Sequence, residues 1–460
     1  DTALPVVSGD LATITQAFED SHRQHFGFAD RGRTLVVETI TVEAISAAAS
    51  VKDEALQPER RPGPLPIAGQ YPVWMNGARH DTSFFDRQQL CPGDRVEGPA
   101  VISEPVATTV VEPGWTAEVT RLNHLLLRRT KPLPARTAIG TDADPVMLEV
   151  FNNLFMSIAE QMGTTLANTA YSVNVKERLD FSCAIFDAAG NLVANAPHMP
   201  VHLGSMSESV RAIIEGNLGQ MQPGDVYALN SPYNGGTHLP DVTVITPVFD
   251  DAGKQILFYV GSRGHHADIG GITPGSMPPH STHVDEEGVL IDNFKLVGSG
   301  GVFHEKAFRD LLASASQPAR NPDNNVADIK AQIAANEKGV HELLKMIGHF
   351  GLEVVHAYMG HVQDNAEESV RRVIDRLDSG EFSYTMDGGH IIKVAVSIDS
   401  RSRSACVDFS GTSNQLSSNF NAPSSVARAA VLYVFRTLVA DDIPMNEGCL
   451  KPIDIVIPAG

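Results

Sequence analysis

The sequence predicts a mixed α/β (α+β) fold, with a small β-rich N-terminal module followed by a larger α/β domain. Short segments rich in Val, Ile and Thr dominate residues 33–129, and Pro-Gly pairs separate several of them. A run rich in Pro, Thr and Asp at residues 131–144 is typical of a linker. Helical and strand-like patterns are mixed from residue 145 to 460. Because 460 residues are too many for one core, we expect separate domains at 1–130 and 145–460.

The composition is that of a globular protein, with 42% hydrophobic and 20% charged residues. The 35 Lys+Arg and 55 Asp+Glu residues give a net charge of −20, which disfavours nucleic acid and anionic membranes as partners. No apolar run reaches about 18 residues, so we expect no membrane span. The 4 cysteines are far apart and form no C-x-x-C pair, which predicts reduced thiols in a cytoplasmic protein. The opening DTALPVV and closing IDIVIPAG lead us to expect a fragment of a longer protein, truncated at its C-terminus.

The N-terminal module begins with a helical pattern over residues 11–26. Residues 33–49 are predicted as strands and residues 52–69 as a proline-rich loop. Short strands follow over residues 71–129. The residues of this module suggest no chemistry by themselves.

The larger domain opens on a helix, for which Asp144 is the predicted N-cap and Pro145 the first helical residue. The segments FSCAIFD and NLVANA then predict a hairpin that leads to His198 and His202. Since Pro197 and Pro200 bound that region, we expect a loop there rather than a helix. Further helices are predicted at 304–318, 322–347 and 351–378, two strands within 381–410, and a last helix near the C-terminus.

Residues 234–271 carry the densest group of candidate site residues. His238 and Asp241 precede two strand-like segments, 241–249 and 255–263, that a turn joins. His265, His266 and Asp268 follow the second segment, and an antiparallel hairpin would bring them near His238 and Asp241. Two imidazoles and a carboxylate suit Zn²⁺, Mn²⁺ or Fe²⁺ and leave positions open for water or substrate. The alternative is that the histidines cap turns and bond buried carbonyls, since H-x-x-D is a weak pattern.

Several long motifs resemble one protein family. The run DRQQLCPGDRVEGPAVISEPVATTVVEPGWTAEV and the segment FEDSHRQHFGF resemble the C-terminal end of the hydantoinase A family, the ATP-using half of 5-oxoprolinases. The segments SVNVKERLDFSCAIFDAAGNLVANAPHMPVHLGSM, LNSPYNGGTHLPDVTVITPVF and GSRGHHADIGGITPGSMPP resemble the hydantoinase B family, and that resemblance covers residues 145–460. The direct junction of the two is similar to single-chain ATP-dependent 5-oxoprolinases. The phosphate-binding motifs G-x-x-x-x-G-K-[ST] and G-x-G-x-x-G do not occur in the sequence.

The resemblance implies a function. The ATPase half, outside this chain, would use ATP and Mg²⁺ to phosphorylate the lactam oxygen of 5-oxo-L-proline. The hydantoinase B half would hydrolyse the activated ring to L-glutamate, with water activated by a divalent metal. An acetone carboxylase subunit of the same family holds its metal through a His-x-x-Asp pair and a later His. Those residues fall on His238, Asp241 and one of His265 and His266, with a slight preference for His265. The fragment alone would be inactive.

Other residues are candidates for the remaining roles. His202, Glu177 and Asp268 are candidates for proton transfer. Asp268 could instead hold a ligand imidazole by its other N–H. Lys176 and Arg178 could bind the substrate carboxylate, although surface charges on a strand would fit the same pattern.

Three alternatives stay open. A hydantoinase of the N-methylhydantoinase type and an acetone-carboxylase-like enzyme belong to the same family. A non-catalytic, metal-stabilised assembly subunit is an alternative of another class. In every case we expect the rest of the same polypeptide as a partner, a small-molecule substrate for the enzymes, and a homo-oligomer.

Overall fold

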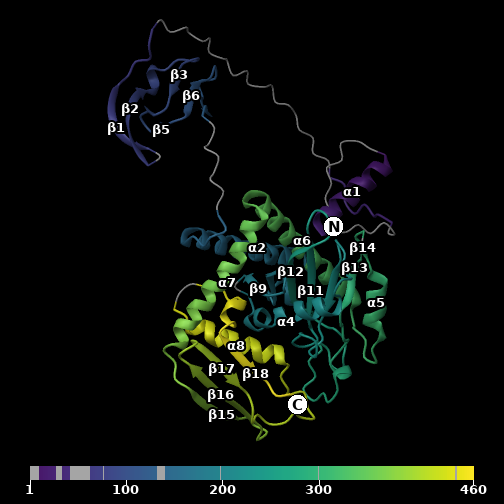
Figure 1. Cartoon of the computed structure of the whole chain (residues 1–460). Coiled ribbons are helices and arrows are strands. Elements are labelled where there is room, and N and C mark those ends of the chain that lie inside the picture. The colour runs from purple at the N-terminus through teal and green to yellow at the C-terminus, as the bar shows by residue number, and fades with distance from the viewer. Residues whose placement is uncertain are drawn as a thin grey trace. The chain divides into compact units, whose positions relative to one another are not determined.

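The computed structural model describes the ranges 10–26, 34–41, 63–75, 77–131, 140–196, 198–298, 300–440 and 443–460 (Figure 1). It divides into two compact units. Unit 1 comprises Asp1–Leu35 and Ile139–Gly460, and unit 2 comprises Val36–Ala138. The predicted loop at 52–69 and the linker at 131–144 lie mostly outside the described residues. The mixed α/β fold class is confirmed, because sheets and helices both occur.

Unit 2 is a β-rich module built from two small sheets. Its four-stranded sheet has the order β1-β2-β4-β5 and its three-stranded sheet the order β3-β6-β7. Their apolar faces share one core, which includes Val96, Ile102 and Val111. The strands are β1 (Gly69–Met75), β2 (Ala78–Asp86), β3 (Arg95–Glu97), β4 (Ala100–Ser103), β5 (Thr108–Val111), β6 (Trp115–Val119) and β7 (Leu125–Arg129).

The prediction of strands over residues 33–49 is wrong where the structure describes them. Residues 34–41 have no regular structure, and residues 42–49 lie outside the described ranges. Val36 and Ile40 are 86% and 80% exposed, so these side chains pack against no sheet face. A β-prone segment forms a strand only where a neighbouring strand and a packing surface are present. The predicted helix at 11–26 is confirmed as α1 (Leu11–Phe26), which contacts α6 (Pro322–Phe350) within unit 1.

The centre of unit 1 is a seven-stranded antiparallel sheet with the order β14-β13-β10-β11-β12-β8-β9. One face packs on α6, where Val242 and Val244 meet Ile329 and Ile333. The other face packs on α4 (Pro200–Gly216), where Ile245 meets Met206 and Val210. The strands are β8 (Phe181–Asp187), β9 (Leu192–Asn195), β10 (Val226–Leu229), β11 (Asp241–Phe249), β12 (Ile256–His265), β13 (Phe294–Gly298) and β14 (Val302–Phe303).

The start of α2 (Pro145–Thr169) agrees with its prediction. The Asp144 side chain accepts a hydrogen bond from Met147 N at 2.8 Å, and Pro145 is the first helical residue. The loop predicted around His202 is wrong, because Pro200 instead begins α4 and places His202 in its first turn. Proline is well tolerated at that position, where its missing N–H would have no helical partner. Pro197 lies outside the described residues.

The C-terminal part of unit 1 is a four-stranded sheet of order β15-β16-β17-β18, whose core is shared with α7 (Leu352–Ile374) and α8 (Ser424–Leu438). The two strands predicted over 381–410 are three, because Gly389 at φ +80° forms a turn inside the first predicted segment. The predicted helix at 304–318 is shorter, as α5 (Glu305–Ser314). The remaining strands are β15 (Gly380–Thr385), β16 (Ile391–Asp399), β17 (Ser404–Asp408) and β18 (Ile453–Val456).

All four cysteines are free thiols. Among the described helices, none is both long and apolar enough to cross a membrane.

The contact between α4 and α8 depends on Gly204. A Cβ at Gly204 would lie 2.5 Å from Ala429 Cα, so Gly204→Ala must separate the two helices. We expect a destabilisation of about 1–3 kcal/mol. Gly348 in α6 is the matched control, since a Cβ there meets no atom within 4 Å. Gly348→Ala should be neutral or stabilise by up to about 1 kcal/mol. Thermal unfolding of both variants tests this, and equal effects would contradict the predicted close approach.

Candidate metal centre

A tight turn before β11 places His238 beside the sheet. Gly235 has φ +83°, and a Cβ on it would lie 2.6 Å from the backbone of Glu208. A Cβ on Gly236 would lie 2.4 Å from Asn230 O. Both positions therefore require glycine. The predicted loop before Asp241 is confirmed, since no helix forms between the glycines and β11.

The predicted hairpin of β11 and β12 is confirmed. Asp241 pairs directly with His265, at the open end of the hairpin. Side chains of directly opposed residues lie on the same face of a sheet. Here that is the face packed on α4. The next pair on the same face is Thr243 and Arg263, and Arg263 donates a hydrogen bond to Ser205 of α4. The register of this hairpin therefore brings Asp241 and His265 together.

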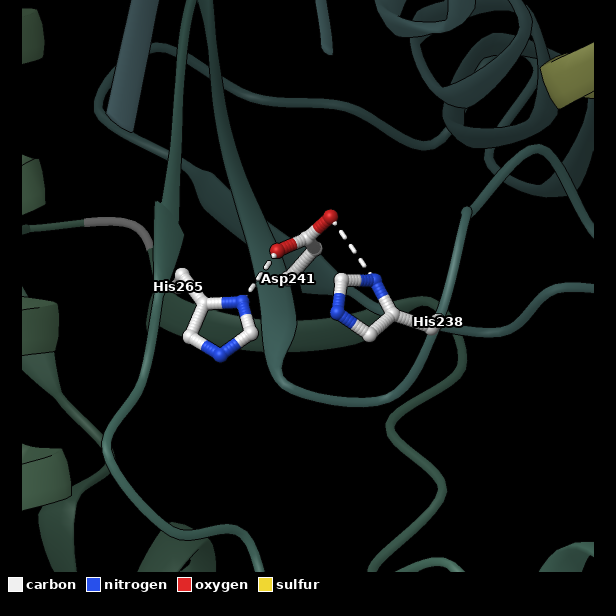
Figure 2. Close-up of side chains that lie close together, drawn as sticks. All are labelled: His238, Asp241 and His265. Atoms are coloured by element: carbon white, nitrogen blue, oxygen red, sulfur yellow. Dashed lines mark hydrogen bonds and ion pairs between the residues drawn. The ribbon is translucent and has the colours of Figure 1, made fainter. Parts of the chain in front are cut away.

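His238, Asp241 and His265 form one cluster, with a possible ligand atom from each lying within 4.8 Å of the others. Figure 2 shows the two imidazole rings on either side of the carboxylate. His238 Nδ1 lies 2.9 Å from Asp241 Oδ2, and His265 Nδ1 lies 3.0 Å from Asp241 Oδ1. Asp241 is 1% exposed, His265 15% and His238 37%, so the cluster is buried on one side and reachable through His238.

The cluster favours an ionised carboxylate. Burial alone would raise the pKa of Asp241, but hydrogen bonds from His202, His238 and His265 outweigh it and hold the pKa well below its usual range. Burial would lower the pKa of His265, yet its hydrogen bond to Asp241 and the charge of Asp241 raise it. A carboxylate that stays ionised beside two imidazoles is a donor set suited to a divalent cation.

His202 and Thr237 also contact Asp241, from positions that are themselves buried. His202 Nε2 lies 3.1 Å from Asp241 Oδ2, and Thr237 Oγ1 donates to the same oxygen at 2.7 Å. His202 was a candidate for proton transfer from the sequence, whereas Thr237 was not singled out. The position of Thr237, directly before His238 in the same loop, is the signal that could have identified it.

Arg263 is a second residue that the sequence pattern did not single out. Its guanidinium is fully buried and donates to the hydroxyls of Thr243, Ser205 and Ser209. Burial lowers the pKa of Arg263 to about 10, while the charge of Asp241 opposes that change. Arg263 lies two residues before His265, so strand periodicity alone places both on one face.

His266 does not join the cluster. Its ring is fully buried on the opposite face of the sheet, where Nε2 lies 3.1 Å from Gln332 Oε1 and Nδ1 lies 3.1 Å from Asn325 Nδ2 of α6. Burial lowers the pKa of His266. Successive residues of an extended chain point to opposite faces, which explains why only one of the two adjacent histidines meets Asp241. The structure therefore separates His266 from the predicted ligand set and keeps His265 in it.

Asp268 does not hold an imidazole in this structure. Its carboxylate pairs with Arg320 at 2.7 Å and accepts from the backbone N–H groups of Gly270, Gly275 and Arg320. These contacts fix the loop after β12 instead. The expectation that Asp268 supports a ligand histidine is corrected, because its oxygens are occupied by donors of that loop.

Lys176, Glu177 and Arg178 lie in and just after a short helix, α3 (Val173–Lys176), rather than on the predicted strand. All three are exposed. Against the effect of burial, the pKa of His265 is raised mainly by Asp241, with a smaller contribution from the charge of Asp180 that the charge of Arg178 opposes. Asp180 was not singled out from the sequence. In the structure its backbone carbonyl accepts a hydrogen bond from His265 N at 3.0 Å.

Comparisons with known sequences agree with the resemblance. The family described as Hydantoinase B/oxoprolinase matches residues 144–460, and the Hydantoinase/oxoprolinase C-terminal domain matches residues 6–129. The chain is 40% identical to a protein named 5-oxoprolinase from Dictyostelium discoideum, over 100% of this chain and 36% of that protein. It is 41% identical to 5-oxoprolinase 1 of Arabidopsis thaliana, over 100% of this chain and 38% of that protein. The chain thus spans little more than a third of these relatives.

Two solved structures share the fold. An ATP-dependent caprolactamase from Pseudomonas jessenii superposes with a TM-score of 0.61 at 23% identity, covering 69% of this chain and 54% of that one. A nucleotide-free acetone carboxylase gives a TM-score of 0.61 at 18% identity, covering 71% of this chain and 45% of that one. Since one family profile covers residues 144–460 and another covers residues 6–129, the chain belongs to the hydantoinase B/oxoprolinase family.

Proposed function

We propose that this chain carries the ring-opening half of an ATP-dependent 5-oxoprolinase. The observation that supports it is the His238–Asp241–His265 cluster in a chain about 40% identical to proteins of that name. The reaction would convert 5-oxo-L-proline to L-glutamate with cleavage of ATP. The ATP and Mg²⁺ would bind to the rest of the same polypeptide, where the lactam oxygen would be phosphorylated. The ring would then be hydrolysed in unit 1.

The proposal includes a divalent metal, zinc, manganese or iron, held by His238, Asp241 and His265. The donor set fits such an ion, because the carboxylate is held ionised and two imidazoles flank it. When bound, the ion would act as a Lewis acid that lowers the pKa of water and so favours hydrolysis near neutral pH. The exposed edge of His238 is the side from which substrate would approach.

The candidates for proton transfer and substrate binding differ in how exposed their side chains are. His202 is 3% exposed and Asp268 is tied to Arg320, so neither is well placed to exchange protons with a substrate. Glu177 is exposed and stays a candidate for that role. Arg178 is exposed and lies two residues before Asp180, whose carbonyl accepts from His265 N, and this position supports a role in binding the substrate carboxylate. A cytoplasmic location and a homo-oligomeric assembly stay predictions.

The function is tested with the complete polypeptide. Incubation with 5-oxo-L-proline and ATP should form L-glutamate and ADP in equal amounts, measured by chromatography of both products. Absence of ATP-dependent glutamate formation would reject this proposal. Turnover of a hydantoin, or carboxylation of acetone, in its place would support the rival enzymes of the same family.

The non-catalytic alternative makes a different prediction for His238→Ala. If the cluster only stabilises an assembly, metal loss should lower the melting temperature while activity per folded molecule survives. A catalytic cluster predicts loss of activity in molecules that remain folded. Activity normalised to the folded fraction, measured by circular dichroism, separates the two.

Arg178→Ala should raise KM for 5-oxo-L-proline more than it lowers kcat. Loss of one charge-assisted hydrogen bond to the substrate carboxylate corresponds to roughly 10- to 100-fold in KM. Lys176→Ala is the control, since Lys176 is a neighbouring exposed cation that lies in α3, two residues further from Asp180 than Arg178. Steady-state kinetics of both variants decide the matter: an equal rise in KM, or none in either, would contradict the assignment to Arg178.

A further inference from the structure

Behind the cluster, on its buried side, His202 connects Asp241 to Ser182. His202 Nε2 lies 3.1 Å from Asp241 Oδ2, and Nδ1 lies 3.2 Å from Ser182 Oγ. The three residues come from α4, β11 and β8, which lie far apart in the sequence. Ser182 is 0% exposed, His202 3% and Asp241 1%, so this chain of contacts is shielded from solvent.

The contacts engage the two ring nitrogens of His202 on opposite sides. Carboxylate oxygens accept hydrogen bonds, so His202 Nε2, which lies 3.1 Å from Asp241 Oδ2, is the donor in that contact. Nδ1 faces the Ser182 hydroxyl, a group that can both donate and accept. Both ring nitrogens are thereby occupied. A ring that is buried and satisfied at both nitrogens has no free position for a substrate.

The geometry of the carboxylate supports a positioning role. Oδ2 lies within hydrogen-bond distance of His202, Thr237 and His238, while Oδ1 faces His265. Rotation of the carboxylate about its last side-chain bond would break the contacts with His202 and Thr237, as well as that with His238. Donors of this kind, which orient a metal-binding group without touching the metal, commonly change metal affinity by about 10- to 100-fold when removed.

We propose that Ser182 and His202 are positioning residues, which hold the Asp241 carboxylate in the orientation that binds a divalent cation together with His238 and His265. The inference rests on the metal site of the proposed function. It reassigns His202 from proton transfer to orientation of Asp241. It also assigns a role to Ser182, which neither strand propensity nor family resemblance had indicated.

Two substitutions at one position separate orientation from packing. In His202→Gln, the side-chain amide nitrogen can take the place of Nε2 and still donate to Asp241. In His202→Asn, the shorter amide matches Nδ1 and can meet Ser182, but does not reach Asp241. Both variants replace a ring by an amide, so losses of packing are similar and only the contact with Asp241 differs.

The measurement is Zn²⁺ affinity of the intact, metal-stripped protein, by competition with a chromophoric chelator. We expect His202→Asn to weaken binding about 10- to 100-fold and Ser182→Ala to weaken it about 10-fold, with His202→Gln within about 3-fold of the wild type. The absorption spectrum of the Co²⁺-substituted protein should change in His202→Asn and stay nearly unchanged in His202→Gln. Melting temperatures of the metal-free Gln and Asn variants should agree.

His198→Asn is the control. His198 packs on Phe181 and accepts from Cys183 N at 3.1 Å, so its ring is engaged away from Asp241. Its Zn²⁺ affinity should stay at the wild-type value. If His202→Asn and His202→Gln bind Zn²⁺ equally well, the positioning role is wrong while the metal site stands. If the wild-type protein binds no Zn²⁺, or if His238→Ala does not abolish the binding, the metal site itself is wrong, and the inference is wrong with it.

Discussion

Asp241→Asn should abolish tight binding of a divalent metal and, with it, hydrolysis by the complete polypeptide. Asp241 supplies the one carboxylate of the cluster, and both of its oxygens face histidine nitrogens. A tetrahedral zinc site binds with about 10–16 kcal/mol in total, so one ligand corresponds to about 3 kcal/mol, or at least roughly 100-fold in affinity. An amide also presents N–H groups toward donors that now meet a carboxylate, which adds to the loss.

The matched control for this result is Asp268→Asn. Asp268 is 16% exposed and lies three residues after His265, but its carboxylate pairs with Arg320. We therefore expect Asp268→Asn to retain wild-type Zn²⁺ affinity, measured by chelator competition and by metal content after dialysis. Undiminished binding in Asp241→Asn would refute the proposed ligand set. An equal loss in both variants would show that general loop stability, rather than coordination, controls the affinity.

The sequence predicted the hairpin, with His238 and Asp241 at one end and His265 and His266 at the other, because the relevant signals are local. Alternating apolar residues, a turn and flanking glycines determine β11 and β12, and an antiparallel pair must join its own ends. The choice between His265 and His266 stayed open in the sequence, because it depends on the register of the hairpin, which the structure supplies. Asp241 opposes His265 in the register, and strand periodicity then sends His266 to the other face.

The contacts around the carboxylate were not predictable in the same way. Ser182 and His202 reach Asp241 from β8 and α4, and no local pattern specifies which helix covers which face of the sheet. The loop expected around His202 shows a related limit. A proline both stops and starts helices, so its effect depends on the residues that come after it, and here Pro200 begins α4.

Arg263 shows how a buried charge is held behind the site. Its guanidinium donates to three hydroxyls, and the described residues include no carboxylate within ion-pair distance of it. Two of those hydroxyls donate onward, from Ser205 to Val201 O and from Ser209 to Gly235 O. Arg263 thereby connects β12 to α4 and to the glycine turn that precedes His238. The planar guanidinium is the feature that allows three such contacts at once.

Arg263→Lys should therefore be more damaging than Arg263→Met, although lysine is the more similar residue. An ammonium group retains the cost of burying a charge and loses most of the hydrogen bonds, each of which contributes about 1.5–3 kcal/mol when charged. We expect a loss of about 3–5 kcal/mol for Arg263→Lys and a smaller one for Arg263→Met, which removes both the charge and the bonds.

The pH dependence distinguishes this cause from a simple packing defect. Burial lowers the pKa of the introduced ammonium group below its value of about 10.4 in the unfolded chain. The unfolded state then binds more protons between those two values, so the stability of Arg263→Lys rises with pH relative to the wild type. Urea unfolding at pH 7 and pH 9 with a chelator present measures this. Arg372→Lys, at a side chain 66% exposed in an ion pair, should change stability by less than about 1 kcal/mol. If Arg263→Lys is as stable as the wild type, or if its loss of stability does not change with pH, the guanidinium charge does not organise this face of the sheet.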